Sequence, residues 1–92
     1  MILGSQSLSL QFQNNNDIEI NNDYTLTSAL VIPLGKTLRI FKKFTNKLKI
    51  INYGTIELNT KEYKKTKKIG IPSSGRATIY NNSDTISDKI LE

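Results

Sequence analysis

Short alternating runs separated by turn residues are the feature of this sequence that most limits its fold. Turn signals recur every 8–12 residues, and apolar and polar residues alternate between them, as is typical of half-buried β-strands. Pro33-Leu34-Gly35-Lys36 predicts the best-defined turn, because proline at the first central position fixes φ and the glycine two residues later tolerates a positive φ. The pattern therefore predicts an all-β chain.

The composition favours the same class. Ile, Thr, Tyr and Phe suit pleated strands, whereas alanine, the best helix former, occurs only at Ala29 and Ala77. Ninety-two residues are enough for a single domain, 1–92, with a small core. We expect a β-sandwich or barrel, with a short β-solenoid as the alternative. The residues expected in the core are Leu38, Ile40, Leu48, Ile50, Ile56, Leu58, Ile71 and Ile79.

Two segments allow more than one interpretation. Residues 4–13 alternate at Leu8, Leu10 and Phe12 with uncharged Ser and Gln, which predicts a strand. We interpret it as an ordinary first strand of a sheet or, because it lacks the charges that protect a sheet edge, as an arm over 1–13 whose apolar residues form an assembly edge. Residues 36–51 predict two strands with a turn near Phe44 to Lys47, although their apolar residues also fit an amphipathic helix. Residues 84–92 are expected to form a loose tail.

The sequence also contains an internal echo. The segment 31–37, VIPLGKT, resembles 70–76, GIPSSGR, about forty residues later. Both place Ile-Pro before a glycine and a basic residue that leads into a strand, so the echo indicates a duplication.

The phrase from Ile32 to Leu38, IPLGKTL, and the phrase from Asn52 to Ile56, NYGTI, together resemble the rungs of parallel β-helix proteins. Such rungs occur in adhesins and in viral or phage appendages. The resemblance covers less than a third of the chain, and it implies a structural protein of a virion or a cell surface.

Enzymatic chemistry has few candidates in this sequence. The chain has no His and no Cys, which removes the commonest general base and the commonest nucleophilic and metal-binding side chains. Asp17 and Glu19 share one face of a strand, where we interpret them as solvated rather than as a Ca²⁺ site or an acid–base pair. Gly35-Lys36-Thr37 lacks the upstream glycine of a phosphate-binding loop. We therefore expect no enzyme activity, no cofactor, no metal and no small-molecule substrate.

Positive charge is concentrated in the middle of the chain. The net charge of +5 divides into −3 for residues 1–35, +10 for 36–76 and −2 for 77–92. Lysines interleaved with aromatic residues are typical of sequence-tolerant nucleic-acid surfaces, and they also suit an acidic protein partner. The basic residues expected to meet an anionic partner are Arg39, Lys42, Lys43, Lys47, Lys49, Lys61, Lys64, Lys65, Lys67 and Lys68. The aromatic residues expected to stack on such a partner are Phe41, Phe44 and Tyr63.

Two functions fit these observations. The first is a structural or decoration protein of a virus or phage, which docks with copies of itself or with other subunits through strand edges and the basic face. The second is a small barrel that binds nucleic acid through its Lys/aromatic face. The sequence shows no signal peptide and no apolar run of membrane-spanning length, so we expect a virion or cytoplasmic location.

Overall fold

A computed structural model describes residues 7–14, 17–67, 69–72 and 77–82, and these form one short helix and ten strands. The strands build three sheets, and all the strand pairs are parallel. Sheet A contains β1 (Asp17–Ile20), β4 (Thr37–Ile40), β7 (Thr55–Leu58) and β10 (Thr78–Asn81). Sheet B contains β2 (Tyr24–Thr25), β5 (Phe44–Asn46) and β8 (Tyr63–Lys65). Sheet C contains β3 (Leu30–Ile32), β6 (Ile50–Asn52) and β9 (Ile69–Gly70).

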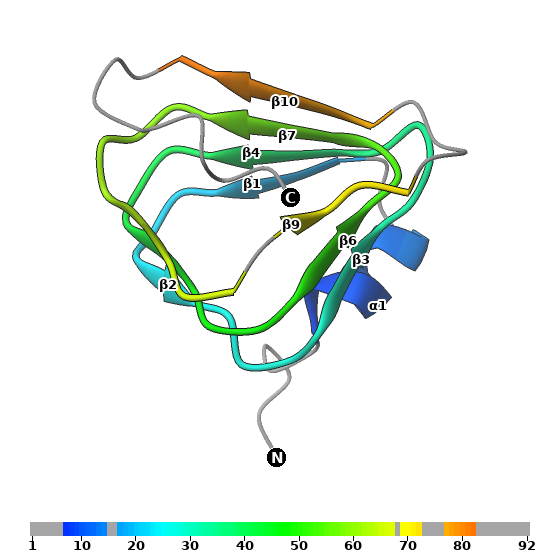
Figure 1. The fold of residues 1–92 in the computed structure, drawn as a ribbon, viewed down its shortest axis with the longest axis horizontal. Helices are drawn as coiled ribbons and strands as arrows, with labels where there is room; N and C mark the ends of the chain where they lie inside the picture. The colour runs from blue at the N-terminus through cyan, green and yellow to red at the C-terminus, as the bar shows by residue number, and fades with distance from the viewer. Residues whose placement is uncertain (1–6, 15–16, 68, 73–76, 83–92) are drawn as a thin grey trace.

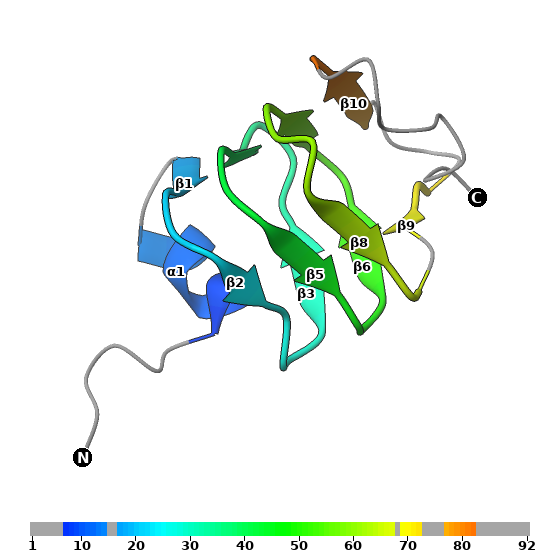
Figure 2. The ribbon, with the colours of Figure 1, turned by 90° about the vertical axis from the view of Figure 1, so that its left-hand side faces the viewer.

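The chain visits sheets A, B and C in turn and then repeats the circuit, so it winds into a coil with a three-sided cross-section (Figure 1). We call one circuit a rung. Thr37 pairs with Asp17 and Thr55 pairs with Thr37, so the first two rungs take 20 and 18 residues. Figure 2 shows β2, β5 and β8 side by side, as successive rungs place them. Parallel strands joined in this way form a coil and not a closed barrel.

The prediction of a chain made mostly of strands is confirmed, and the arrangement of the strands differs from a sandwich or barrel. Alternation sends Ile18, Leu38 and Ile56 inward from three successive strands of sheet A, where they stack along the coil. Leu30, Ile50 and Ile69 form a similar buried column from sheet C. Among a sandwich, a barrel and a short solenoid, the solenoid is the arrangement in which such columns run through parallel strands.

The predicted core is confirmed for five residues, Leu38, Ile40, Ile50, Ile56 and Leu58, which are buried. Leu48, Ile71 and Ile79 are half-buried and pack against that core. Further residues that were not among those expected in the core are also buried. These additional core residues are Leu8, Phe12, Ile18, Ile20, Leu26, Leu30, Ile32, Phe44 and Ile69.

The predicted strand over 4–13 is wrong in its described part, because α1 (Leu8–Asn14) is a helix. Ser7 begins it, since its Oγ accepts the Leu10 N–H at 3.2 Å and its carbonyl accepts the Gln11 N–H at 3.0 Å. Leu8 and Phe12 are four residues apart on one helical face and are both buried. Leu10 is on the other side and is 46% exposed, so the three residues predicted to form an assembly edge do not share one.

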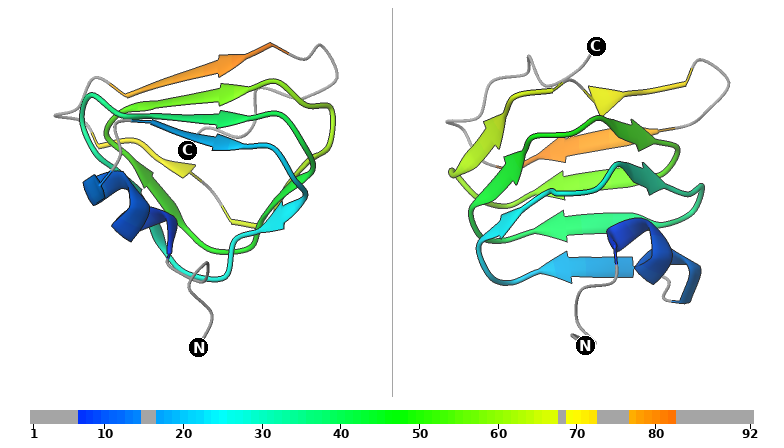
Figure 3. Two further views of the ribbon diagram at one scale, coloured as in Figure 1. Left: turned by 180° about the vertical axis from the view of Figure 1, so that it is seen from behind. Right: turned by 90° about the horizontal axis from the view of Figure 1, so that it is seen from below.

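Helix α1 packs against β1 and β3 at the end of the coil where the first rung begins (Figure 3). The Ser9 Oγ accepts the Val31 N–H at 2.9 Å and donates to the Ala29 carbonyl at 3.3 Å. The helix therefore covers one side of β3 and closes part of the open end of the core.

The turn at Pro33-Leu34-Gly35-Lys36 is confirmed, with a shift of one position. The Lys36 N–H donates to the Pro33 carbonyl at 3.1 Å, so Leu34 and Gly35 are the central residues and Gly35 has φ of 83°. Residues 36–51 contain the strands β4, β5 and β6 and no helix. The turn predicted at Phe44 to Lys47 is wrong, because Phe44–Asn46 is strand β5. The predicted arm at 1–6 and the tail at 84–92 lie outside the described residues.

Candidate interaction surfaces

Two of the three aromatic residues predicted to stack on a ligand lie inside the coil. Phe44 is fully buried, and its ring stacks on Tyr24 at 5.7 Å and on Tyr63 at 5.9 Å between ring centroids. Burial raises the pKa of Tyr63 to about 12, against a smaller opposing effect of its hydrogen bond with Asn46. Phe41 remains 39% exposed. The rings of Phe44 and Tyr63 therefore stabilise the coil.

The predicted basic face is divided among several surfaces. Lys42, Lys43 and Lys61 lie where the chain passes from sheet A to sheet B, which we call the A–B corner. Lys47, Lys49 and Lys67 lie between sheets B and C, at the B–C corner, and all three are exposed. Lys64 is exposed on sheet B, Arg39 is on sheet A, and Lys68 and the side chain of Lys65 are outside the described part of the structure.

The outer face of sheet A carries an ionic cluster around Arg39. Its Nη1 lies 3.1 Å from Oδ2 of Asp17, and its Nε lies 3.4 Å from Oε1 of Glu57. Asp17 also accepts the Thr37 N–H at 3.0 Å. The hydrogen bond that Arg39 donates to Asp17, together with the charges of Glu57, Asp17 and Glu19, raises the pKa of Arg39. This guanidinium thus joins carboxylates from the first and third rungs, and the face keeps a net charge of −2 from the four side chains.

The B–C corner has the opposite character. Lys47 and Lys49 come from the second rung and Lys67 from the third, and no salt bridge joins any of them to an acidic side chain in the described ranges. In the three-sided cross-section this corner lies opposite sheet A (Figure 1). The lysines of the B–C corner therefore lie on the side of the coil opposite the carboxylates of sheet A, whereas those of the A–B corner lie beside that face.

The buried polar side chains serve the coil itself. Asn52 Nδ2 donates to the Thr78 carbonyl at 3.3 Å, and its Oδ1 accepts the Gly54 N–H at 2.9 Å. Asn46 Nδ2 donates to the Lys67 carbonyl at 2.9 Å, which fixes the backbone at the B–C corner. Buried amides of this kind hold successive rungs together where the chain turns.

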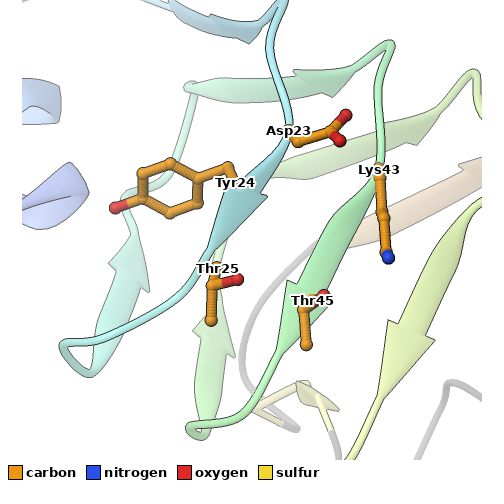
Figure 4. Close-up of a pocket in the computed structure, with 5 residues that line it drawn as sticks. All are labelled: Asp23, Tyr24, Thr25, Lys43 and Thr45. Atoms are coloured by element: carbon orange, nitrogen blue, oxygen red, sulfur yellow. The ribbon is translucent and has the colours of Figure 1, made fainter.

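The described surface has several hollows of moderate size. One of about 200 Å³ is lined by Asp23, Tyr24, Thr25, Lys43 and Thr45 (Figure 4). A second of about 190 Å³ lies between α1 and the segment from Ile18 to Tyr24. A third of about 330 Å³ lies on the apolar outer side of sheet C, around Ile51 and Gly70.

The described residues contain no group of three His, Cys, Asp or Glu side chains placed to hold a metal ion. None of the helical structure in the described ranges has the length and hydrophobicity needed to span a bilayer. The chain matches no family model, no curated protein and no solved structure.

Proposed function

We propose that this chain is a non-enzymatic structural module that assembles in multiple copies, as a structural or decoration protein of a virus or phage does. The observation that carries the proposal is the separation of charge across the coil. Glu19 and Glu57 lie on the face of sheet A, whereas Lys47, Lys49 and Lys67 lie at the opposite B–C corner. The resemblance of Ile32–Leu38 and Asn52–Ile56 to β-helix rungs supplies the proposed setting, a virion.

Two surfaces of opposite charge on one coil favour contact between copies. Both follow the same rungs, which are about 4.8 Å apart: the lysines of the B–C corner occur in neighbouring rungs, and Glu19 and Glu57 lie two rungs apart on sheet A, so the two surfaces can align along two parallel coils. Because the two surfaces differ, the contact is heterologous, and repeated contacts extend into a line or lattice unless a rotation closes them. A contact limited to one corner and one face is weak by itself and gains strength from repetition.

Salt-dependent association of the whole chain tests this proposal. Light scattering and sedimentation at low and high ionic strength should show assemblies that dissociate as salt screens the charges. Lys47→Glu with Lys67→Glu should abolish the assemblies, and so should Glu19→Lys with Glu57→Lys. An equimolar mixture of the two double variants should restore them, because each then offers what the other lacks.

The matched control reverses two lysines at the A–B corner, Lys42→Glu with Lys61→Glu, and should leave assembly intact. It changes the net charge by the same amount as the reversal at the B–C corner. Circular dichroism checks that each variant keeps its strands. A wild-type chain that is monomeric at every ionic strength would refute the proposal.

A nucleic-acid partner is the second candidate, favoured by the exposed lysines at the B–C corner and Lys64 on sheet B. It stands second because Phe44 and Tyr63 are occupied inside the coil, which removes two of the stacking positions that sequence-tolerant binding uses. A salt-dependent mobility shift of single-stranded DNA, lost when Lys64, Lys65, Lys67 and Lys68 are reversed, would support it. No shift at low salt would eliminate it.

A further inference from the structure

Strand β2 forms the first edge of sheet B, and in the described part of the chain no strand pairs with its outer side. Helix α1 packs against the first strands of the other two sheets, β1 and β3 (Figure 3). In Figure 2, β2 lies at the end of its sheet beside β5, with its other side turned away from the strands. Among the residues that the structure describes, the first rung is therefore covered on two sides and open along β2.

The backbone of β2 is arranged to accept another strand. The Tyr24 N–H donates to the Lys43 carbonyl at 2.9 Å, and the Leu26 N–H donates to the Thr45 carbonyl at 2.9 Å. Successive residues of a parallel strand direct their backbone groups to opposite sides. The N–H and C=O of Thr25 therefore point away from β5, toward the open side.

Side chains of sheet B form three columns that run from rung to rung. Tyr24, Phe44 and Tyr63 stack with interplanar angles of 14° and 2°. Asp23, Lys43 and Glu62 precede these rings and alternate in charge, and Thr25 pairs with Thr45 in the third column. One more strand beside β2 would continue the columns best with a basic residue against Asp23, an aromatic ring against Tyr24 and a hydroxyl residue against Thr25.

Two hollows border β2: one lies across β2 and β5, and the other, between α1 and Tyr24, gives an added strand room for its side chains. The hollow of about 200 Å³ is open beside Asp23, Thr25 and Lys43 (Figure 4). The hollow of about 190 Å³ reaches from Tyr24 to Leu8 and Gln11 of α1. Both include Asp23 and Tyr24 in their walls, and Figure 4 shows the Tyr24 ring turned away from Asp23, Thr25 and Lys43.

We propose that β2 binds an extended segment of another protein by strand addition, and that this segment has the order basic, aromatic, Ser or Thr. A second folded copy does not fit. Its own matching residues, Lys43-Phe44-Thr45, belong to the central strand β5 and are paired on both sides. Its last sheet B strand, β8, would bring Glu62 close to Asp23, and like charges in that position repel.

The probe for this site is a synthetic peptide with the sequence of residues 41–47, FKKFTNK, which carries the required order. Fluorescence anisotropy of the labelled peptide, titrated with the full chain, should show saturable binding. Replacing its central Phe by Ala should weaken binding about fivefold to tenfold, because one stacked ring pair is lost. Replacing the Lys before that Phe by Glu should weaken binding by a similar factor.

Two variants of the protein make the test specific. The Asp23→Lys variant should no longer bind the original peptide and should bind the Glu-substituted peptide. A merely structural role of Asp23 would not produce this exchange of specificity. Thr25→Pro should abolish binding but keep the fold, since an edge residue whose N–H faces outward tolerates proline. Glu62→Lys is the matched control, because it reverses one carboxylate at the other end of sheet B, two strands from β2, and should bind normally.

The absence of saturable binding at millimolar peptide, or equal binding of the Phe and Ala peptides, would overturn this inference. Neither result would refute the proposed association of copies, because that association depends on sheet A and the B–C corner. If the peptide instead dissociates assemblies of the wild-type chain, copies of the chain occupy β2 and the inference of a different protein is wrong.

Discussion

Gly54 lies where two rungs approach each other closely, and substituting it tests the coil directly. A Cβ at this position would contact the Lys36 carbonyl oxygen and lie 2.5 Å from that of Pro33. Both contacts are with backbone atoms of the turn in the preceding rung. That turn is held by the bond from the Lys36 N–H to the Pro33 carbonyl and by the bond from the Thr55 N–H to the Lys36 carbonyl.

Gly54→Ala therefore cannot be accommodated by rotation of a side chain. Relief of the overlap requires the backbone to move and at least one of these two hydrogen bonds to lengthen. Forced shifts of this kind cost about 1–3 kcal/mol, and the loss of a backbone hydrogen bond adds about 1 kcal/mol. We expect the free energy of unfolding to fall by about 3 kcal/mol, a large part of the stability of a domain of this size.

Two other glycines provide matched controls for the same substitution. Gly35 has φ of 83° and open space around it, so Gly35→Ala should cost about 1 kcal/mol through backbone strain alone. Gly70 would gain ordinary contacts at 3.5 Å with Ile51 and Lys49, so Gly70→Ala should change stability by at most about 0.5 kcal/mol. Urea unfolding monitored by circular dichroism measures all three. A loss below 1 kcal/mol for Gly54→Ala, or a larger loss for Gly70→Ala, would refute the close contact between rungs.

Two further predictions concern the core. Below pH 10 Tyr63 is neutral in both states, whereas between pH 10 and 12 only the unfolded chain loses the proton, because burial raises the folded pKa to about 12. Urea titrations should show stability falling as pH rises to 11.5, and Tyr63→Phe should remove about 2 kcal/mol of that fall; equal pH dependence in both proteins would contradict a buried phenol. Phe12→Ala should cost about 3–5 kcal/mol and Leu10→Ala less than about 0.5 kcal/mol, since Phe12 is buried and Leu10 is 46% exposed. Equal urea midpoints for these two variants would instead indicate the strand that the alternation at residues 8, 10 and 12 predicted.

The local alternation of apolar and polar residues was sufficient to predict strands of sheet A. Asp17–Ile20, Thr37–Ile40 and Thr55–Leu58 each alternate clearly, and each is a strand with its apolar residues inward. The turn at Pro33–Lys36 was also predictable, because proline and glycine restrict the backbone by themselves. Alternation does not indicate which strands are neighbours. The order of neighbouring strands is what distinguishes a coil from a sandwich.

The internal echo indicates which strands are neighbours, but its spacing of about forty residues corresponds to two rungs. Val31 and Gly70 begin the two similar segments, and in the structure both align with Ile51, which lies between them. The echo therefore spans two rungs and not one repeat. The intermediate copy begins at Ile51 and reads INYG, without the proline, so it does not resemble its neighbours. A period of about 20 residues would have favoured a solenoid from the sequence.

The helix and the aromatic column depend on contacts that the local pattern does not encode. The even spacing of Leu8 and Phe12 fits a strand, and their separation of four residues fits a helix. The segment is a helix in the structure, where it packs against β1 and β3. Phe44 and Tyr63 lie in lysine-rich segments, which indicated a ligand-binding surface. Their inward orientation follows from stacking on the ring in the next rung, a contact between residues about 20 positions apart.

The distribution of charge follows from the same stacking. The outer column of sheet A consists of Glu19, Arg39 and Glu57. The column that precedes the aromatic rings of sheet B consists of Asp23, Lys43 and Glu62. In both columns the basic residue has a carboxylate in the rung on either side. At the B–C corner the first rung carries Thr27, Ser28 and Ala29 where the next rungs carry lysines, so positive charge there has no such partner. Both alternating columns also begin with an acidic residue at the open end of the coil. Lysines without an alternating carboxylate thus mark the B–C corner, and an acidic residue without a basic neighbour on its outer side marks the edge at β2, which is why we assign external partners to these two surfaces.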